Sequence, residues 1–193
     1  IFDESERLSR LINNVLKLSN LSRNQEVVEP EFVGVGFLKD LIQLKVSTLI
    51  TKNNFKLNFI IDDEVLETKL LYVDLDAFVQ IVINLIDNSV KFYNAAKIDD
   101  PQRQLIDIMF AHDKNTNKKL KFSIRDYGPG ISKSQHEKIF ELFYRCGNEM
   151  TRTTSGTGIG LSLVHQLVIA QGGTIIVTRQ QPGVSFELTF SAQ

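Results

Sequence analysis

The sequence carries polar side chains at helical spacing within its most regular apolar segment, residues 74–93. They repeat at i, i+3, i+4 and i+7 and are Asn84, Asp87, Asn88 and Lys91. A helix would place them on one face. Asparagine is a poor helix former, whereas a solvated face would ordinarily carry Glu, Lys or Gln. Amide oxygens suit Mg²⁺, which completes its shell with phosphates and water, and a lysine one turn later could meet a phosphate. The face predicts either a solvated stripe or a magnesium and phosphate site.

A second chemical motif is Asp126-Tyr-Gly-Pro-Gly130, which directly follows the predicted strand at residues 120–125. An ionised carboxylate only accepts hydrogen bonds, so at a strand end it could select the exocyclic amine of adenine. The glycines would let a ligand approach the backbone closely. Because Asp, Gly and Pro all favour turns, a simple turn is the alternative interpretation.

The third motif, Gly156-Thr-Gly-Ile-Gly-Leu161, opens a predicted helix at residues 158–171. Free backbone N–H groups and the helix dipole favour an anion such as phosphate at that position. No Gly-Lys-Ser/Thr follows, so the motif is not a Walker A loop. It also follows a Thr- and Ser-rich loop rather than a strand, which excludes the dinucleotide-binding fingerprint. A glycine-rich hinge remains the alternative.

The elements that must position these motifs indicate an α/β fold, a two-layer sandwich. We expect about five strands in one sheet, three main helices on one face and the N-terminal helix apart. The predicted strands are residues 55–61, 104–111, 120–125, 174–178 and 184–190. Residues 62–64 are expected to form a turn or loop, and residues 145–158 a mobile loop because of their Thr, Ser and Gly content.

Residues 1–23 form an amphipathic helix by their heptad-like apolar spacing. It either packs on its own domain or is the end of a helical bundle, and we favour the bundle. Residues 24–36 contain Pro30, Gly34 and Gly36 and are predicted to be a linker. The main domain is expected to span residues 37–193.

Composition limits the functional classes. The chain has 193 residues, 42% hydrophobic, 23% charged, with a net charge of −1, which suits one globular domain with an appendage. That balance provides no basic footprint for nucleic acid. The single cysteine, Cys146, excludes an internal disulfide framework and a thiolate zinc site. No apolar run reaches the roughly 20 residues of a membrane span, and no signal peptide is visible. A cytoplasmic setting is expected, and the missing initiator methionine suggests a fragment.

Taken together, the motifs resemble the GHKL nucleotide-binding family, and more closely the catalytic, ATP-binding domain of sensor histidine kinases. Residues 84–92 are similar to that family's N box, residues 126–130 to its G1 box, residues 140–145 to its F box and residues 156–161 to its G2 box. The likeness covers residues 32–190 and implies a Bergerat-type ATP-binding fold. The F box and the short lid favour a histidine kinase over type II topoisomerase, mismatch-repair or chaperone relatives.

The resemblance implies roles for individual residues. Asn88 would ligate Mg²⁺ with help from Asn84, Lys91 would face the phosphates, and Asp126 would read the adenine amine. The other ATP-binding positions that it implies are Phe92, Gly128, Gly130, Arg145, Gly156, Thr157, Gly158, Gly160, Leu161 and Ser185. In this set the three glycines from 156 to 160 would cradle phosphates at the end of a lid spanning residues 145–157, and Ser185 would lie near the adenine. Phe140 and Phe143 are expected to be packing anchors for that lid.

The implied enzyme is a protein-histidine kinase with ATP and Mg²⁺ as its cofactors. The family phosphorylates a histidine on a dimerisation helix and passes the phosphoryl group to a response regulator. This sequence has only His112, His136 and His165, none in residues 1–23. Residues 1–23 then resemble the end of the second dimerisation helix, and autophosphorylation of this chain is not expected. The implied partners are the phosphoacceptor-histidine helix, a response regulator and, in the full-length protein, a second copy. The domain would be cytoplasmic, in parents that commonly are membrane-anchored sensors.

Two alternatives belong to other classes. A GHKL-type ATPase would hydrolyse ATP to drive dimer closure, with Asp87 as the candidate acid. A degenerate interaction scaffold would bind no nucleotide. A conventional protein kinase is excluded because the His-Arg-Asp and Asp-Phe-Gly motifs are missing.

Overall fold

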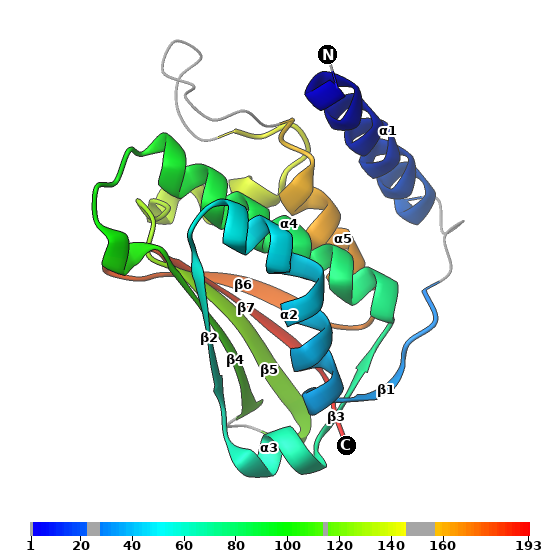
Figure 1. Cartoon of the computed structure of the whole chain (residues 1–193). Coiled ribbons are helices and arrows are strands. Elements are labelled where there is room, and N and C mark those ends of the chain that lie inside the picture. Colours follow the sequence, from blue (N-terminus) through cyan, green and yellow to red (C-terminus); the bar gives the residue numbers. More distant parts are fainter. Residues whose placement is uncertain (1, 23–27, 114–115, 146–156) are drawn as a thin grey trace.

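The structure is a computed structural model that describes residues 2–22, 28–113, 116–145 and 157–193 (Figure 1). Its helices are α1 (Phe2–Ser22), α2 (Val35–Lys52), α3 (Asp63–Thr68), α4 (Leu75–Ala95) and α5 (Gly160–Ala170), with short 3₁₀ turns η1 (Pro101–Arg103), η2 (Lys133–Gln135) and η3 (Lys138–Phe140). Its strands are β1 (Glu31–Gly34), β2 (Lys56–Ile61), β3 (Leu70–Val73), β4 (Leu105–Asp113), β5 (Thr116–Asp126), β6 (Thr174–Arg179) and β7 (Val184–Ser191).

Five of the strands form one mixed sheet in the order β2-β4-β5-β7-β6, within the described residues. Only β2 and β4 run parallel, and the other neighbours are antiparallel. Helices α2, α4 and α5 lie side by side on one face of this sheet (Figure 1). The predicted two-layer α/β sandwich is therefore confirmed, with the three main helices on one face.

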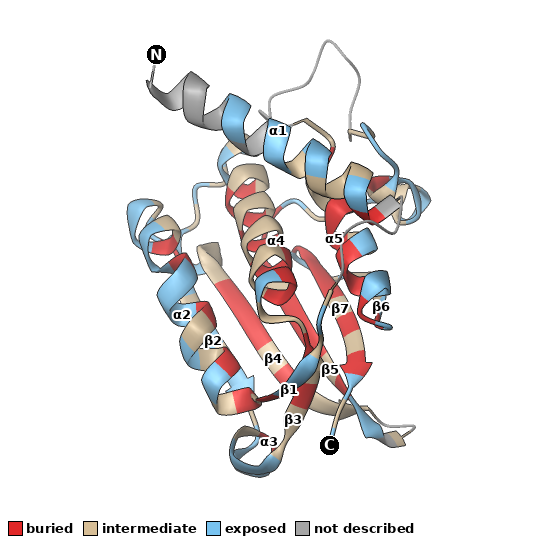
Figure 2. Cartoon of the chain, turned by 90° about the vertical axis from the view of Figure 1, so that its right-hand side faces the viewer, coloured by how far each residue is buried: buried red, intermediate tan, exposed pale blue. Residues whose placement is uncertain are grey.

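The core lies between these two layers. Side chains alternate along a strand, so every second residue of β4 and β5 faces the helices. On β5 these residues are Leu120, Phe122 and Ile124, all 1% exposed or less. The ring of Phe122 packs at 5.0 Å from Phe78 of α4 and at 4.8 Å from Phe110 of β4. Figure 2 shows the same pattern as red residues on the sheet and on the helix faces turned toward it.

Helix α4 has the sequence signals that its boundaries require. Asp74 is its N-cap, and the carboxylate accepts a 2.9 Å hydrogen bond from the N–H of Ala77. That bond satisfies one of the free donors of the first turn. The apolar stripe of the helix is buried and its polar stripe is half-buried. The predicted helix at residues 74–93 is confirmed, one residue shorter at its start and two residues longer at its end.

The segment before α2 differs from the prediction. Residues 31–34 of the expected linker form β1, which pairs antiparallel with β3, a strand that was not predicted. Helix α2 begins at Val35 rather than after residue 36. Residues 63–68 form α3 where a turn or loop was expected. The short strands were missed because Pro30 and Gly34 are residue types typical of loops. In addition, the pairing partner of β1 lies about 40 residues later in the chain.

Helix α1 is not wholly apart from the domain. It contacts α5 (Figure 2), and near its C-terminal end Leu21 is 9% exposed within the core cluster. Farther toward its N-terminus Leu8, Ile12 and Leu16 remain more than half exposed. The helix thus packs on the domain at one end and presents an apolar stripe to solvent at the other. No helix in the described part of the chain is long and apolar enough to cross a membrane.

Candidate functional site

The polar face of α4 meets the glycine-rich start of α5. A methyl carbon at position 160 would lie 3.3 Å from Oδ1 of Asn84 and 3.9 Å from Nδ2 of Asn88. Because Gly160 has no side chain, the first turn of α5 can lie this close to both amides. The amide nitrogen of Asn84 donates to the carbonyl of Gln80 at 2.9 Å, which leaves Oδ1 as the atom turned toward α5. The sequence predicted these two motifs as parts of one site, and the structure brings them together.

Lys91 pairs with a neighbour on its own helix. Its ammonium forms an ion pair and hydrogen bond with Asp87, one turn earlier on α4. This i, i+4 pairing is the local interaction that a lysine and an aspartate at that spacing favour. That Lys91 faces the phosphates of a bound nucleotide stays a prediction. The candidate acid Asp87 is engaged by the same pair.

Asp126 ends β5 and is 8% exposed. Its Oδ1 accepts the N–H of Gly128 at 2.9 Å, and its Oδ2 accepts the hydroxyl of Ser89 at 3.3 Å. Ser89 follows Asn88 on α4, so one hydrogen bond ties the carboxylate to the helix that carries the amides. Burial raises the pKa of Asp126, and hydrogen bonds from the backbone of Gly128 and Val184, then Ser89 and the charge of Arg125, oppose that rise.

Glycines allow the strand ends around Asp126 to come together. Gly183 has φ +94, and a Cβ there would lie 1.9 Å from the carbonyl oxygen of Asp126. Gly130 has φ +77, and a Cβ there would lie 3.0 Å from the carbonyl oxygen of Gly183. Both positive φ values favour glycine. At Gly128 a Cβ would lie 3.1 Å from Oδ1 of Asp126. The role of Gly183 was missed, although the turn at residues 181–183 gave a signal for it.

The residues just before α5 form a backbone hydrogen bond with the predicted F-box segment. The N–H of Phe143 donates to the carbonyl of Gly158 at 2.9 Å, and a Cβ on Gly158, whose φ is +72, would lie 2.7 Å from the carbonyl carbon of Phe143. The ring of Phe140 packs 5.4 Å from that of His165 on α5. Phe143 is 64% exposed and has φ +63. The expectation that both phenylalanines anchor the lid concerns a segment that lies mostly outside the described residues.

Ser185 lies on the wrong face of the sheet for its predicted role. Val184 is the cross-strand partner of Asp126, whereas Ser185 is the partner of Arg125. Since successive side chains of a strand point to opposite faces, Ser185 and Asp126 are on opposite faces. The prediction that Ser185 lies near an adenine bound at Asp126 is therefore wrong. Sequence reasoning did not fix the register of β7 against β5, and a shift of one residue reverses the face.

The remaining predicted positions differ in how far the structure describes them. Phe92, Thr157 and Leu161 are half-buried, and Leu161 packs against the core. Arg145 is half-buried at the edge of the described residues. Gly156 and most of the predicted lid fall outside the residues that the structure describes. Sequence reasoning missed Ser89, whose only signal was a small polar residue inside a helix next to Asn88.

The geometry combines three chemical functions on adjoining elements. Amide oxygens of α4 are suited to a hard cation, the first turn of α5 to an anion, and the buried carboxylate of Asp126 to an N–H donor. Within the described residues no cluster of His, Cys, Asp or Glu could hold a metal ion. A cation bound here would therefore rely on amide oxygens and on the ligand's own oxygens.

Comparison with known proteins identifies the family of the chain. Residues 73–193 match the family described as histidine kinase-, DNA gyrase B-, and HSP90-like ATPase. The chain is 31% identical over 175 residues to sensor histidine kinase WalK of Bacillus subtilis, covering 90% of this chain and 26% of that protein. It is 28% identical over 187 residues to hybrid signal transduction histidine kinase F of Dictyostelium discoideum, covering 95% of this chain and 16% of that protein. The chain thus spans about a quarter or less of these curated relatives.

Solved structures share the fold at low sequence identity. Full-length ShkA in complex with AMPPNP superposes with a TM-score of 0.76 at 21% identity, over 99% of this chain and 37% of that one. The catalytic domain of histidine kinase ThkA gives 0.63 at 24% identity, over 84% and 95%. ThkA in complex with the response regulator TrrA gives 0.69 at 23% identity, over 97% and 48%.

Proposed function

The chain belongs to the family of histidine kinase-, DNA gyrase B- and HSP90-like ATPases, and from that membership we propose that it is the ATP-binding kinase domain of a two-component sensor. ATP is the nucleotide of this family. The observation that carries the proposal is the joining of Asp126 and the amides of α4 through Ser89, with the start of α5 against those amides. Asp126 can accept an adenine amine while the first turn of α5 receives phosphates.

Magnesium fits the residues present. Asn84 uses its amide nitrogen internally, so Oδ1 is its available ligand atom, and Asn88 lies one turn later on the same face. One or two protein oxygens are what Mg²⁺ commonly takes when a nucleotide supplies the rest. When bound, magnesium would neutralise charge on the phosphate oxygens. The chain's own contribution is to orient the nucleotide, because phosphoryl transfer depends mainly on positioning and charge stabilisation.

The acceptor of the phosphoryl group is proposed to be a histidine on a dimerisation helix outside these residues. His165 packs against Phe140, and His136 contacts the carbonyl of Ile131 through Nε2. Neither of these contacts involves Asn88 or Asp126. Relatives along most of the chain are named as sensor kinases, and ThkA is known in complex with a response regulator. These names support a response regulator as the final acceptor.

The test has two parts. Calorimetric titration of the chain with ADP, with and without Mg²⁺, should show binding that magnesium strengthens. Radiolabelled ATP should then transfer label to a separately supplied dimerisation segment carrying the acceptor histidine, but not to the chain itself. Label on the chain's own histidines would contradict the proposed acceptor. Steady-state ATP hydrolysis by the isolated chain that Asp87→Asn abolishes would favour an ATPase instead. Absence of any nucleotide binding would favour an interaction scaffold.

A further inference from the structure

We propose that Arg103 is a positioning residue for adenine recognition, acting through the peptide group between Tyr127 and Gly128. This inference rests on the proposed function, because it concerns the same nucleotide site. Arg103 ends the 3₁₀ turn η1, in the connection between α4 and β4. Its Nε donates to the carbonyl oxygen of Tyr127 at 2.8 Å, and its Nη2 donates to the carbonyl oxygen of Gly128 at 2.8 Å. One guanidinium therefore holds two consecutive carbonyls.

The peptide group between Tyr127 and Gly128 links Arg103 to the carboxylate of Asp126. A trans peptide is planar, and its C=O and N–H point in opposite directions. Arg103 holds the oxygen end of this plane, and Oδ1 of Asp126 holds the N–H end at 2.9 Å. Rotation of the plane would carry the N–H away from the carboxylate. Arg103 thus fixes the orientation of the group that reads the adenine amine without touching the nucleotide itself.

Tyr127 is braced at its other end as well. Its hydroxyl donates to Oδ2 of Asp107 at 2.6 Å, and the amide of Asn58 donates to Oδ1 of Asp107 at 2.9 Å. The guanidinium of Arg125 lies 4.4 Å from the centroid of the Tyr127 ring. These strand residues fix the side chain of Tyr127 from β2, β4 and β5. The backbone clamp by Arg103 and this brace together hold the loop after Asp126.

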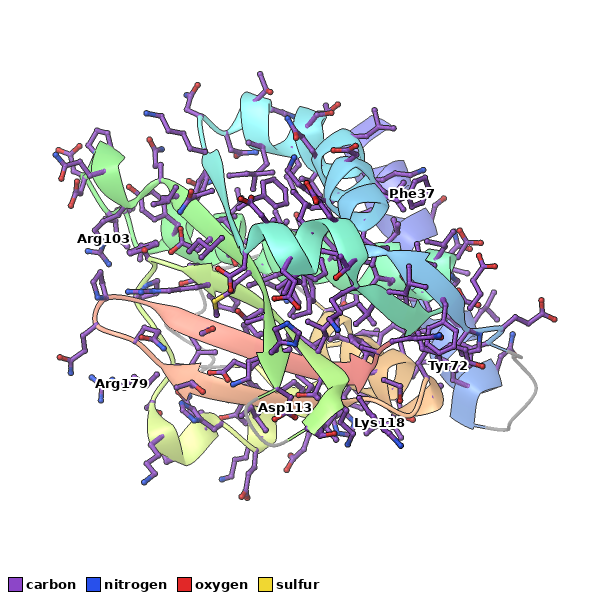
Figure 3. The ribbon with its side chains drawn as sticks, turned by 90° about the horizontal axis from the view of Figure 1, so that it is seen from below. Phe37, Tyr72, Arg103, Asp113, Lys118 and Arg179 are labelled. Carbon is purple, nitrogen blue, oxygen red and sulfur yellow. The ribbon has the colours of Figure 1, made fainter. Side chains whose placement is uncertain are left out.

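The clamp is also tied to the helix that carries the amide ligands. The hydroxyl of Tyr93 on α4 donates to the carbonyl of Asp100, the N-cap of η1, at 2.7 Å. Figure 3 labels Arg103 at one end of the molecule, away from Asp113 and Lys118 near the β4–β5 hairpin. Arg103 thus connects the end of α4 to the loop of Asp126.

The experiment measures discrimination between two ligands. Titration compares ADP with purine riboside diphosphate, which lacks the exocyclic amine. The wild-type chain should prefer ADP by roughly tenfold or more, as expected for a hydrogen bond to a charged group. Arg103→Ala should reduce this preference to below about threefold, mainly through weaker ADP binding. The reason is that the peptide group that orients the Asp126 carboxylate toward the adenine amine is no longer held in place. Arg103→Lys should be intermediate, since a lysine cannot reproduce the two-pronged contact.

Two controls separate positioning from general stability. Lys118→Ala removes one positive charge from an exposed side chain at the far end of the sheet. Lys121→Met breaks the 2.7 Å ion pair with Glu187 on the helix-free face. Both should leave the ADP preference unchanged even where Lys121→Met lowers the melting temperature.

The outcomes are distinct. An unchanged ADP preference in Arg103→Ala, whatever its melting temperature, overturns the positioning role. If Arg103→Ala does not fold, Arg103→Lys decides, together with Tyr127→Phe, which removes only the bond to Asp107 and should weaken the preference partly. Failure of the wild-type chain to bind ADP would overturn the proposed function itself. A wild-type chain that binds both ligands equally would leave nucleotide binding intact, and it would overturn both the adenine contact of Asp126 and the positioning role of Arg103.

Discussion

Replacing Asp126 with asparagine should separate nucleotide binding from folding. In the folded chain Oδ1 of residue 126 would still accept the N–H of Gly128. The new amide nitrogen could donate to the hydroxyl oxygen of Ser89, whose own hydrogen can go to the carbonyl of Leu85 at 3.0 Å. The hydrogen bonds with Gly128 and Ser89 therefore survive, and the backbone N–H of Val184, which also bonds the carboxylate, keeps an acceptor where it faces Oδ1. The substitution removes the acceptor that an adenine amine needs, because an amide N–H would face another N–H.

The expected loss follows from the charge of the carboxylate. A hydrogen bond to a charged group contributes about 1.5–3 kcal/mol, so ADP affinity should fall by about 10- to 150-fold. At a nucleotide concentration about 100 times the wild-type dissociation constant, binding adds about 2.7 kcal/mol to the wild-type stability. With a 100-fold loss the variant gains only about 0.4 kcal/mol at the same concentration. For a domain of this size the melting shift should drop from about 5–11 °C to about 1 °C.

Without ligand, the variant should be at least as stable as the wild type at pH 7. Burial raises the pKa of Asp126 above its ordinary value of 3.8, so the folded chain holds this proton more tightly than the unfolded chain. The free energy of unfolding should fall as the pH rises from the pKa of Asp126 in the unfolded chain through its higher pKa in the folded chain. Asp126→Asn should lack this pH-dependent loss. At pH 7 the ligand-free variant should then melt at or above the wild-type temperature.

The assay is a thermal melt of both proteins with and without Mg-ADP at several pH values, beside Asp40→Asn. Asp40 is an exposed carboxylate on α2, so its variant removes the same charge away from the site and should keep the full ligand shift. A full shift in Asp126→Asn would refute the assignment of the adenine contact. A ligand-free variant that melts well below the wild type would refute the claim that the network tolerates an amide.

Three further substitutions test other parts of the structure. Gly183→Ala should lower the free energy of unfolding, measured in urea, by about 3 kcal/mol or more, because its Cβ would lie 1.9 Å from the carbonyl oxygen of Asp126. Gly172 also has a positive φ, +70, but nothing lies within 4 Å of a Cβ there, so Gly172→Ala should cost only about 1–2 kcal/mol in the same measurement. Phe122→Ala should cost about 3–5 kcal/mol in the same measurement because its side chain is fully buried. Asn88→Ala should remove the Mg²⁺ dependence of ADP binding measured by calorimetry with and without EDTA.

Each of these has a matched control in the chain. Leu44→Ala, at 70% exposure, should change the free energy of unfolding little beside Phe122→Ala. Asn94→Ala, an exposed position on the same helix as Asn88, should keep the Mg²⁺ dependence. Equal losses in Gly183→Ala and Gly172→Ala would show that backbone conformation, not the close contact, governs position 183. Retained Mg²⁺ dependence in Asn88→Ala would remove that amide from the metal site.

Local features of the sequence could be read directly because each depends on neighbouring residues. The apolar period of residues 74–93 and the capping carboxylate of Asp74 gave α4, because one helix face and one cap are fixed within a few turns. The segment at residues 120–125 was likewise predicted as a strand and forms part of β5. The residue types at Asn84, Asn88 and Asp126 were sufficient to suggest amide ligands and an acceptor for an amine, but not to exclude a solvated stripe or a simple turn.

Contacts between distant residues could not be read in the same way. Ser89 and Asp126 are 37 residues apart, and nothing near either one marks the other as its partner. Ser185 was placed on the wrong face because a strand's side chains alternate with every residue, so its face depends on the register with β5.

The sequence by itself determined which chemical groups this protein has and in what order, and it placed those of α4, β5 and α5 in their elements, because helical period, strand alternation and glycine patterns are local. The tertiary structure alone decided which of those groups meet. Arg103 reaches the peptide after Tyr127, Gly183 lies against the Asp126 carbonyl, and Gly160 lies against Asn84. Each of these contacts depends on strand register and helix packing, which are set by the burial of the whole core rather than by any short stretch of the chain.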